Sequence, residues 1–139
     1  MNWKRLLVLA LVPVVAGAVF VLGGCSQQKT EMVKTAEWVQ SHLPPDAVVV
    51  AHDIGALGYF DDHRLIDLAG LVSPEVIPFI RDEDRLAQYL DSRGATYLVA
   101  FPDLYPQLVA DARLVFSSGG DIAPALGQPN MTVYCWRCR

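Results

Sequence analysis

The stretch from His52 to Leu71 (HDIGALGYFDDHRLIDLAGL) gathers histidines, carboxylates and glycines that could bind a ligand or do chemistry. It follows Ala47–Ala51 (AVVVA), an uninterrupted apolar run that predicts a strand covered on both faces, as in parallel sheets. In open α/β sheets, ligands usually bind beyond the carboxyl ends of such strands. The candidate ligand-binding residues at this position are His52, Asp53, Gly55, Gly58, Tyr59 and Asp67.

Two interpretations of this stretch are open. His52 and Asp53 could serve a ligand, or act as a general acid–base pair in a small independent enzyme. Alternatively, Gly55 and Gly58 permit a tight turn and Asp53 caps it. The GxxG spacing is only a fragment of a phosphate-binding fingerprint, so the structural interpretation is preferred and no catalytic residue is assigned. It predicts a loss of stability in Gly58→Ala if Gly58 has a positive φ.

Other carboxylates in the stretch raise the questions of ion pairing and metal binding. Asp67 lies among apolar neighbours, and a buried carboxylate needs a partner, which Arg64 or His52 could supply. Asp61 and Asp62 are adjacent, as is common in solvated turns. Carboxylates and imidazoles are side chains that can bind divalent cations, and this stretch has five of them: His52, Asp53, Asp61, Asp62 and His63. Because acidic residues are common in turns for other reasons, we predict no metal and no cofactor.

Cys135 and Cys138 form a CxxC motif. A thioredoxin-type site needs this pair at the start of a helix, which lowers the pKa of the first thiol. No helix follows the motif in this sequence, so we expect a disulfide or two incidental thiols. A zinc site is not expected, because the histidines show no metal-binding spacing to these cysteines.

The N-terminal residues predict a membrane attachment. Lys4 and Arg5 precede Leu6–Gly24, a run of 19 uncharged residues, and Cys25 follows. The run is near the lower limit for spanning a bilayer of ~30 Å and longer than a signal-peptide core of about 7–15 residues. Residues 1–25 are thus either a signal/lipoprotein leader, with Cys25 as the lipidated residue of a lipobox-like LGGC, or a single transmembrane anchor. Both place the rest on the extracytoplasmic face of the cell membrane.

Residues 26–30 are a short polar spacer, and residues 31–139 are predicted to form one extracytoplasmic α/β domain. Apolar spacing and cap residues predict helices over 31–43, 82–93 and 103–111, and a further helix start at Ser73-Pro74-Glu75. The predicted strands are 47–51, 64–68, 96–101, 114–116 and 131–136, the last antiparallel to its neighbour or at an edge. Together they predict a three-layer fold with a mostly parallel sheet of about five strands, preceded by one N-terminal hydrophobic helix.

Residues Glu31–Phe116 carry a resemblance to a known domain. HDIGALGYF, DLAGLVSPEV and RDEDRLAQYLDSRGATYLVAFP resemble the soluble C-terminal extracytoplasmic domain of polytopic bacterial glycosyltransferases that use lipid-phosphate sugars, the dolichyl-phosphate mannosyltransferase-like superfamily. That family's catalytic acidic residues belong to a many-helix membrane domain which this sequence does not contain. The resemblance therefore implies an accessory or acceptor-binding module that is not catalytic alone, with a polytopic membrane glycosyltransferase or a lipid-linked sugar as partner.

The net charge of the sequence argues against one class of function. It is −4 for the whole sequence and −6 without Lys4 and Arg5. Because nucleic-acid binding relies on a basic surface, no nucleic-acid partner is predicted. Besides the binding module, an independent enzyme using His52 and Asp53 and a non-functional remnant of a larger glycosyltransferase are the alternatives.

Overall fold

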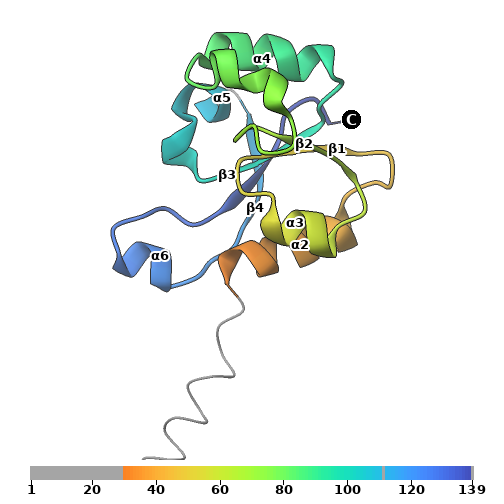
Figure 1. Ribbon diagram of the computed structural model, residues 1–139. Helices are drawn as coiled ribbons and strands as arrows, with labels where there is room; N and C mark the ends of the chain where they lie inside the picture. Colours follow the sequence, from red (N-terminus) through yellow and green to blue (C-terminus); the bar gives the residue numbers. More distant parts are fainter. Residues whose placement is uncertain (1–29, 111, 139) are drawn as a thin grey trace, which may run out of the picture.

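A five-stranded sheet forms the centre of the computed structural model, which describes residues 30–110 and 112–138 (Figure 1). The strand order is β2-β1-β3-β5-β4. The strands are β1 (Val48–Ala51), β2 (Arg64–Asp67), β3 (Tyr97–Ala100), β4 (Arg113–Ser117) and β5 (Thr132–Cys135). All five correspond to predicted strands.

The sheet is mixed. β2, β1 and β3 are parallel, whereas β5 pairs antiparallel with both β3 and β4. The predicted mostly parallel sheet is therefore wrong in this respect, and β5 is antiparallel but not at an edge. The reason is that residues 118–131, which join β4 to β5, contain only the short helix α6 (Ile122–Ala125). A parallel neighbour needs a crossover, usually a helix that packs on a face of the sheet, and none of the described side chains of the four-residue α6 belongs to either core cluster.

β1 and β3 are inner strands buried on both faces, as predicted from their apolar sequences. On one face Val50 and Leu98 belong to a core with α4 (Glu83–Ser92) and α5 (Pro106–Ala110). On the other, Val49 and Val99 pack with α2 (Glu31–His42) and α3 (Gly55–Phe60). The two helical layers and the sheet give the predicted three-layer α/β arrangement (Figure 1).

The helix ends follow from local capping. Thr30 caps α2 by accepting a hydrogen bond from the N–H of Val33 at 3.4 Å, and Asp82 caps α4 by accepting from the N–H of Arg85 at 3.0 Å. The predicted helix start at Ser73 opens a 3₁₀ helix, η1 (Pro74–Phe79). The predicted helix over 103–111 is divided into a 3₁₀ turn, η2 (Pro102–Leu104), and α5, which begins at Pro106.

α3 is a helix where the sequence predicted a tight turn. Its backbone includes a hydrogen bond from the N–H of Gly58 to the carbonyl of Ile54 at 2.7 Å. Gly58 does not have a positive φ, so the strain anticipated for Gly58→Ala has no structural basis. The expectation that Asp53 caps this element is wrong, because the N-cap of α3 is Ile54, which makes no side-chain cap bond; the Oδ1 of Asp53 accepts from the N–H of Gly55 at 3.4 Å.

Gly58→Ala is expected to stabilise the domain by about 0.5–1 kcal/mol, because alanine loses less conformational entropy in a helix than glycine. Gly58 is exposed, and a Cβ there meets no atom within 4 Å. Chemical denaturation measures the effect. The control is Gly94→Ala, equally uncrowded but at φ +71°, which should destabilise the protein. A destabilised Gly58→Ala protein would contradict the assignment of α3.

Some predictions fall outside the described residues. They are the N-terminal hydrophobic helix and the lipidation of Cys25. Within residues 30–110 and 112–138, none of the helices has the length and apolar character needed to cross a membrane.

Candidate functional site

His52 and Tyr105 meet at one edge of the sheet. Because β1 and β3 are parallel neighbours, the segments that follow them emerge side by side. His52 follows β1 directly, and Tyr105 follows η2 after β3. The Nδ1 atom of His52 lies 2.6 Å from the phenolic oxygen of Tyr105, whose side chain is buried. The imidazole is thus held in place at the carboxyl edge of the parallel strands.

The Tyr105 hydroxyl is placed to donate a hydrogen bond to Nδ1 of His52. Burial, followed by the negative charges of Asp67 and Glu83, raises the pKa of Tyr105 to about 12. The phenol therefore keeps its proton near neutral pH and can donate it to Nδ1 of a neutral His52. The ring proton then sits on Nε2, which has no hydrogen-bond partner in the described part of the chain.

A groove of about 550 Å³ lies in front of this pair. Its lining residues are His52, Ile80, Arg81, Glu83, Leu104 and Tyr105. Glu83 has a structural task there, because its Oε2 accepts hydrogen bonds from the N–H groups of Gln107 and Leu108 at 2.8 and 2.7 Å. The imidazole Nε2–H and the exposed guanidinium of Arg81 remain as donors. Such a groove suits a ligand that presents acceptor oxygens.

Asp67 is fully buried and organises the loop after β2. Its Oδ1 accepts from the N–H of Ala69 at 2.7 Å and its Oδ2 from the N–H of Val72 at 2.8 Å. Its own N–H donates to the hydroxyl of Ser73 at 3.3 Å. The hydrogen-bond partners of this carboxylate are therefore backbone amides, and the expectation that Arg64 or His52 would pair with it is wrong. Asp67 influences the groove through the pKa of Tyr105.

The other four candidate residues lie between the end of β1 and the end of α3. Asp53 bonds to the N–H of Gly55, and among the described residues its carboxylate shares no hydrogen bond with His52. Gly55 is the first residue of α3, and Gly58 lies in its interior. Tyr59 is 82% exposed and its ring meets that of Phe60 edge-on, with centroids 4.7 Å apart. Of the six candidates, the structure brings His52 alone into the groove lining.

His63, Asp61 and Asp62 form structural contacts near the start of β2. His63 Nδ1 lies 2.6 Å from Asp61 Oδ1, and its Nε2 lies 2.9 Å from the carbonyl of Pro44. The N–H of Asp62 donates to Gln40 Oε1 at 2.9 Å. These contacts join the α3–β2 loop to α2 and to the turn after it. Across the described ranges, no group of three or more His, Cys, Asp or Glu residues is arranged to hold a metal ion.

The lining of the groove includes residues that were not predicted from the sequence, among them Tyr105, Arg81 and Leu104. A signal for two of them was present. Tyr105 and Leu104 follow the second buried strand, and the rule that selected His52 after β1 applies equally to residues after β3. Arg81 precedes α4 and carried no such signal.

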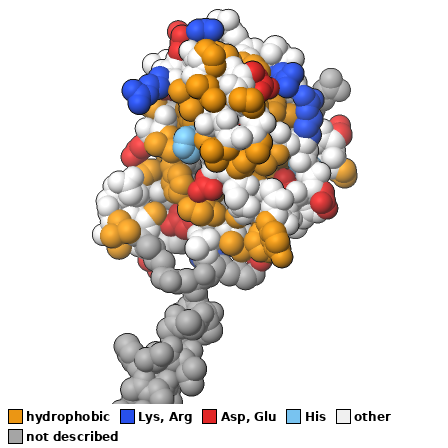
Figure 2. Space-filling model, viewed as in Figure 1, with side chains coloured by type: hydrophobic (Ala, Val, Ile, Leu, Met, Phe, Trp, Pro, Cys, Tyr) orange, Lys and Arg blue, Asp and Glu red, His pale blue; other side chains and the backbone are white. Residues whose placement is uncertain are grey.

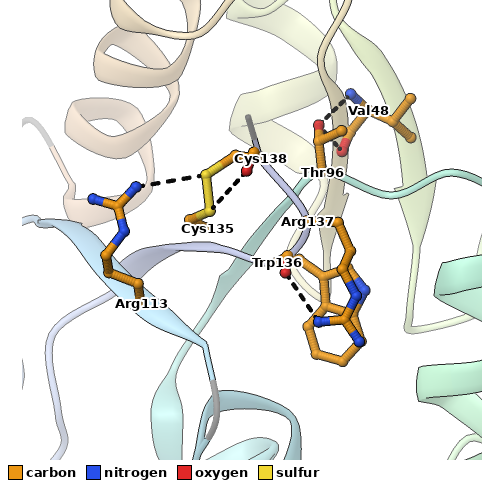
Figure 3. The surroundings of a disulfide bond; sticks show 7 residues. All are labelled: Val48, Thr96, Arg113, Cys135, Trp136, Arg137 and Cys138. Atoms are coloured by element: carbon orange, nitrogen blue, oxygen red, sulfur yellow. Dashed lines mark hydrogen bonds between the residues drawn. A yellow bond between two sulfur atoms is a disulfide. The ribbon is translucent and has the colours of Figure 1, made fainter.

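Cys135 and Cys138 form a disulfide at the opposite edge of the sheet (Figure 3). The segment between them is held by the carbonyl of Thr96, which accepts from the N–H groups of Trp136 and Arg137 at 2.9 and 3.1 Å. Thr96 precedes β3, and its hydroxyl exchanges hydrogen bonds with both backbone groups of Val48 at 2.8 and 3.1 Å. The disulfide therefore secures the tail to the amino ends of β1 and β3, away from the His52 groove.

Comparison with known proteins leads to a family of undescribed activity. No curated protein and no solved structure matches the chain. One family model does match, over residues 21–134, and this range includes every strand of the sheet apart from the last residue of β5. The family is described as a domain of unknown function (DUF8728), and because its model covers more than half of the sequence, the chain belongs to it.

Proposed function

We propose that this domain is a membrane-tethered, extracytoplasmic binding module that holds an oxygen-rich ligand, such as the phosphate or sugar of a lipid-linked sugar, in the His52 groove. The observation that carries the proposal is the His52–Tyr105 pair, which holds an imidazole in the lining of a groove that Arg81 also lines. An anchored donor set of this kind recognises acceptor oxygens. The resemblance to the tail domain of lipid-phosphate-sugar glycosyltransferases supports the same ligand class.

The way the chain enters the domain supports a location at the membrane surface. α2 precedes β1 and packs against the sheet, so its first turn lies at the carboxyl edge, where Glu31 contacts the loop after β4. The six residues from 25 to 30 extend at most about 20 Å. If the uncharged run Leu6–Gly24 lies in the bilayer, the groove is held close to the headgroups, where a lipid-linked sugar or a polytopic glycosyltransferase presents its polar part.

A binding role fits the contacts of His52 better than independent catalysis does. Among the described residues, the imidazole hydrogen-bonds to a phenol whose pKa is raised, and Asp53 bonds to a backbone amide. The His52/Asp53 acid–base pair of an independent enzyme therefore lacks its hydrogen bond. The alternative of a non-functional remnant predicts no specific ligand.

His52→Ala is expected to weaken ligand binding about tenfold, the effect of losing one hydrogen bond to a charged group. The measurement is titration of the full chain in phosphatidylcholine nanodiscs with a polyprenyl-phosphate hexose. Tyr105→Phe should weaken binding by a smaller factor, because the ring remains while the hydroxyl that orients His52 is lost. The control is His42→Ala, at the far end of α2, where the imidazole stacks on Trp38.

Equal affinities of the parent, His52→Ala and His42→Ala proteins would contradict the proposed site. Hydrolysis or transfer of the hexose by the isolated chain would favour the enzyme alternative. Absence of binding by the parent protein would favour the remnant.

A further inference from the structure

A second groove, strongly apolar, adjoins the His52 groove. Its volume is about 520 Å³, and its lining residues are Thr30, Glu31, Met32, Phe101, Asp103, Leu104, Ala123, Leu126 and Gln128. Leu104 lines both grooves. The side chains of Leu104 and Leu126 are 50% and 74% exposed, although leucine gains free energy by leaving water. The groove is formed by the first turn of α2, the segment after β3 and the loop that carries α6.

Other exposed apolar side chains lie on the same edge of the domain. Leu71 and Val72 follow β2, and Ile77 belongs to η1, which packs next to that loop. In the view of Figure 2, hydrophobic side chains extend over the whole visible face, with Asp and Glu side chains among them, while the visible Lys and Arg side chains lie mostly at the end away from the start of the described chain. An apolar surface that extends over several loops marks a site of contact with another apolar phase or partner.

The sequence before Thr30 indicates what covers this surface. Thr30 itself lines the apolar groove, and the uncharged run Leu6–Gly24 ends only six residues earlier. A bilayer that accommodates this run is therefore within about 20 Å of the groove. The tether keeps the local concentration of lipid high, so that even weak insertion of a few leucines becomes effective. A groove of this size cannot hold the 19-residue run itself.

The charges around the groove specify the mode of contact. No Lys or Arg is among its lining residues. Its acidic residues are Asp103 and Glu31, and the carboxylate of Glu31 is already engaged by the hydroxyl of Ser118 at 2.9 Å and the N–H of Met131 at 3.0 Å. Contact with a membrane here would rely on apolar insertion, and it would not depend on anionic lipids or low salt.

We infer that the apolar groove, with Leu104 and Leu126 at its rim, docks the domain on the surface of the phospholipid bilayer to which its own N-terminal segment attaches. Docking in this orientation places the adjoining His52 groove at the level of the lipid headgroups. The inference extends the proposed function by giving the domain a fixed orientation, and it does not require a ligand in the His52 groove.

The test is methyl NMR on the full chain in phosphatidylcholine nanodiscs that contain a lipid spin-labelled on its acyl chain. The methyl signals of Leu104 and Leu126 are expected to lose at least three times more intensity than those of Leu114, a leucine on β4 that is 55% exposed and outside the groove. The difference should persist in high salt and without anionic lipid. A Leu104→Ser/Leu126→Ser variant should reduce the broadening of Met32, whereas Leu114→Ser should not.

Equal broadening of the three leucines would overturn the inference. Protection of Leu104 and Leu126 that rises with protein concentration, without broadening by the spin label, would also overturn it and would indicate a second copy of the chain on this face. Because the polyprenyl-phosphate titration is a separate measurement, failure of docking is distinguishable from failure of the proposed ligand site.

Discussion

Asp67→Ala is expected to lower the free energy of unfolding by about 3 kcal/mol. A hydrogen bond to a charged group contributes about 1.5–3 kcal/mol, and this buried carboxylate accepts one from the N–H of Ala69 and one from that of Val72. The substitution also leaves a cavity at a fully buried position. Chemical denaturation of the purified protein measures the change.

The matched control for this prediction is Asp62→Ala. Asp62 is exposed, and its contact with Gln40 is made by its backbone N–H, which the substitution retains. We expect a change of less than about 0.5 kcal/mol, as is usual for surface positions. If Asp67→Ala lost as little as this control, the loop after β2 would be held by packing and not by its carboxylate.

Glu31→Ala is expected to lower the free energy of unfolding by about 2 kcal/mol, the second largest effect. The Oε2 atom of Glu31 accepts from the hydroxyl of Ser118 and the N–H of Met131, and Oε1 lies 3.4 Å from the N–H of Ala123. A single carboxylate thus connects the first turn of α2 to both ends of the β4–β5 loop. Without it, the amides of residues 118–131 should exchange faster with solvent.

Glu31→Gln tests whether the charge or the acceptor geometry matters. Its amide oxygen can take the place of Oε2 and accept from Ser118 and Met131, but its NH₂ group then faces the N–H of Ala123, and the charge is lost, so we expect about half of the loss. Gly120 supports the tight fit: a Cβ there would come within 2.9 Å of Glu31 Oε1. A Glu31→Ala protein with unchanged stability and unchanged exchange in the loop would contradict this role.

The inner strands and the long helices were predictable because their sequences match their surroundings. β1 and β3 are apolar throughout and buried on both faces, while α2 and α4 show helical apolar spacing and end two residues before Pro44 and Gly94, respectively. α3 was missed because two glycines in six residues favour a turn. Packing of Leu57 into the core, where it is buried, overrides that preference.

The direction of β5 could not be read from its own residues. Thr132, Val133 and Tyr134 are buried, as in a strand with two neighbours, although the sequence alternates like an edge strand. Direction is set by the connection to the preceding strand, and residues 118–131 offer α6 alone as regular structure.

The candidate site was predictable in part. His52 was found because it follows a recognisable strand, whereas Tyr105 is 53 residues away and joins it through tertiary structure. The partners of Asp67 are local, at positions two and five residues later. An aspartate that bonds to the backbone two residues on is a known turn motif, and the bond from the N–H of Ala69 to Asp67 is an example of it.

The position of β5 determines the order in which the sheet can be completed. Among the strands of residues 30–110 and 112–138, β4 pairs with β5 alone, and β5 separates it from β3. During synthesis β4 emerges first and has no strand to pair with until residues 132–135 arrive. The first three strands can associate as a parallel unit beforehand, but the native sheet closes only when its latest strand inserts into the middle. A ribosome or translocon that still holds these residues therefore holds an incomplete sheet, with the edge of β3 open to pairing with other chains.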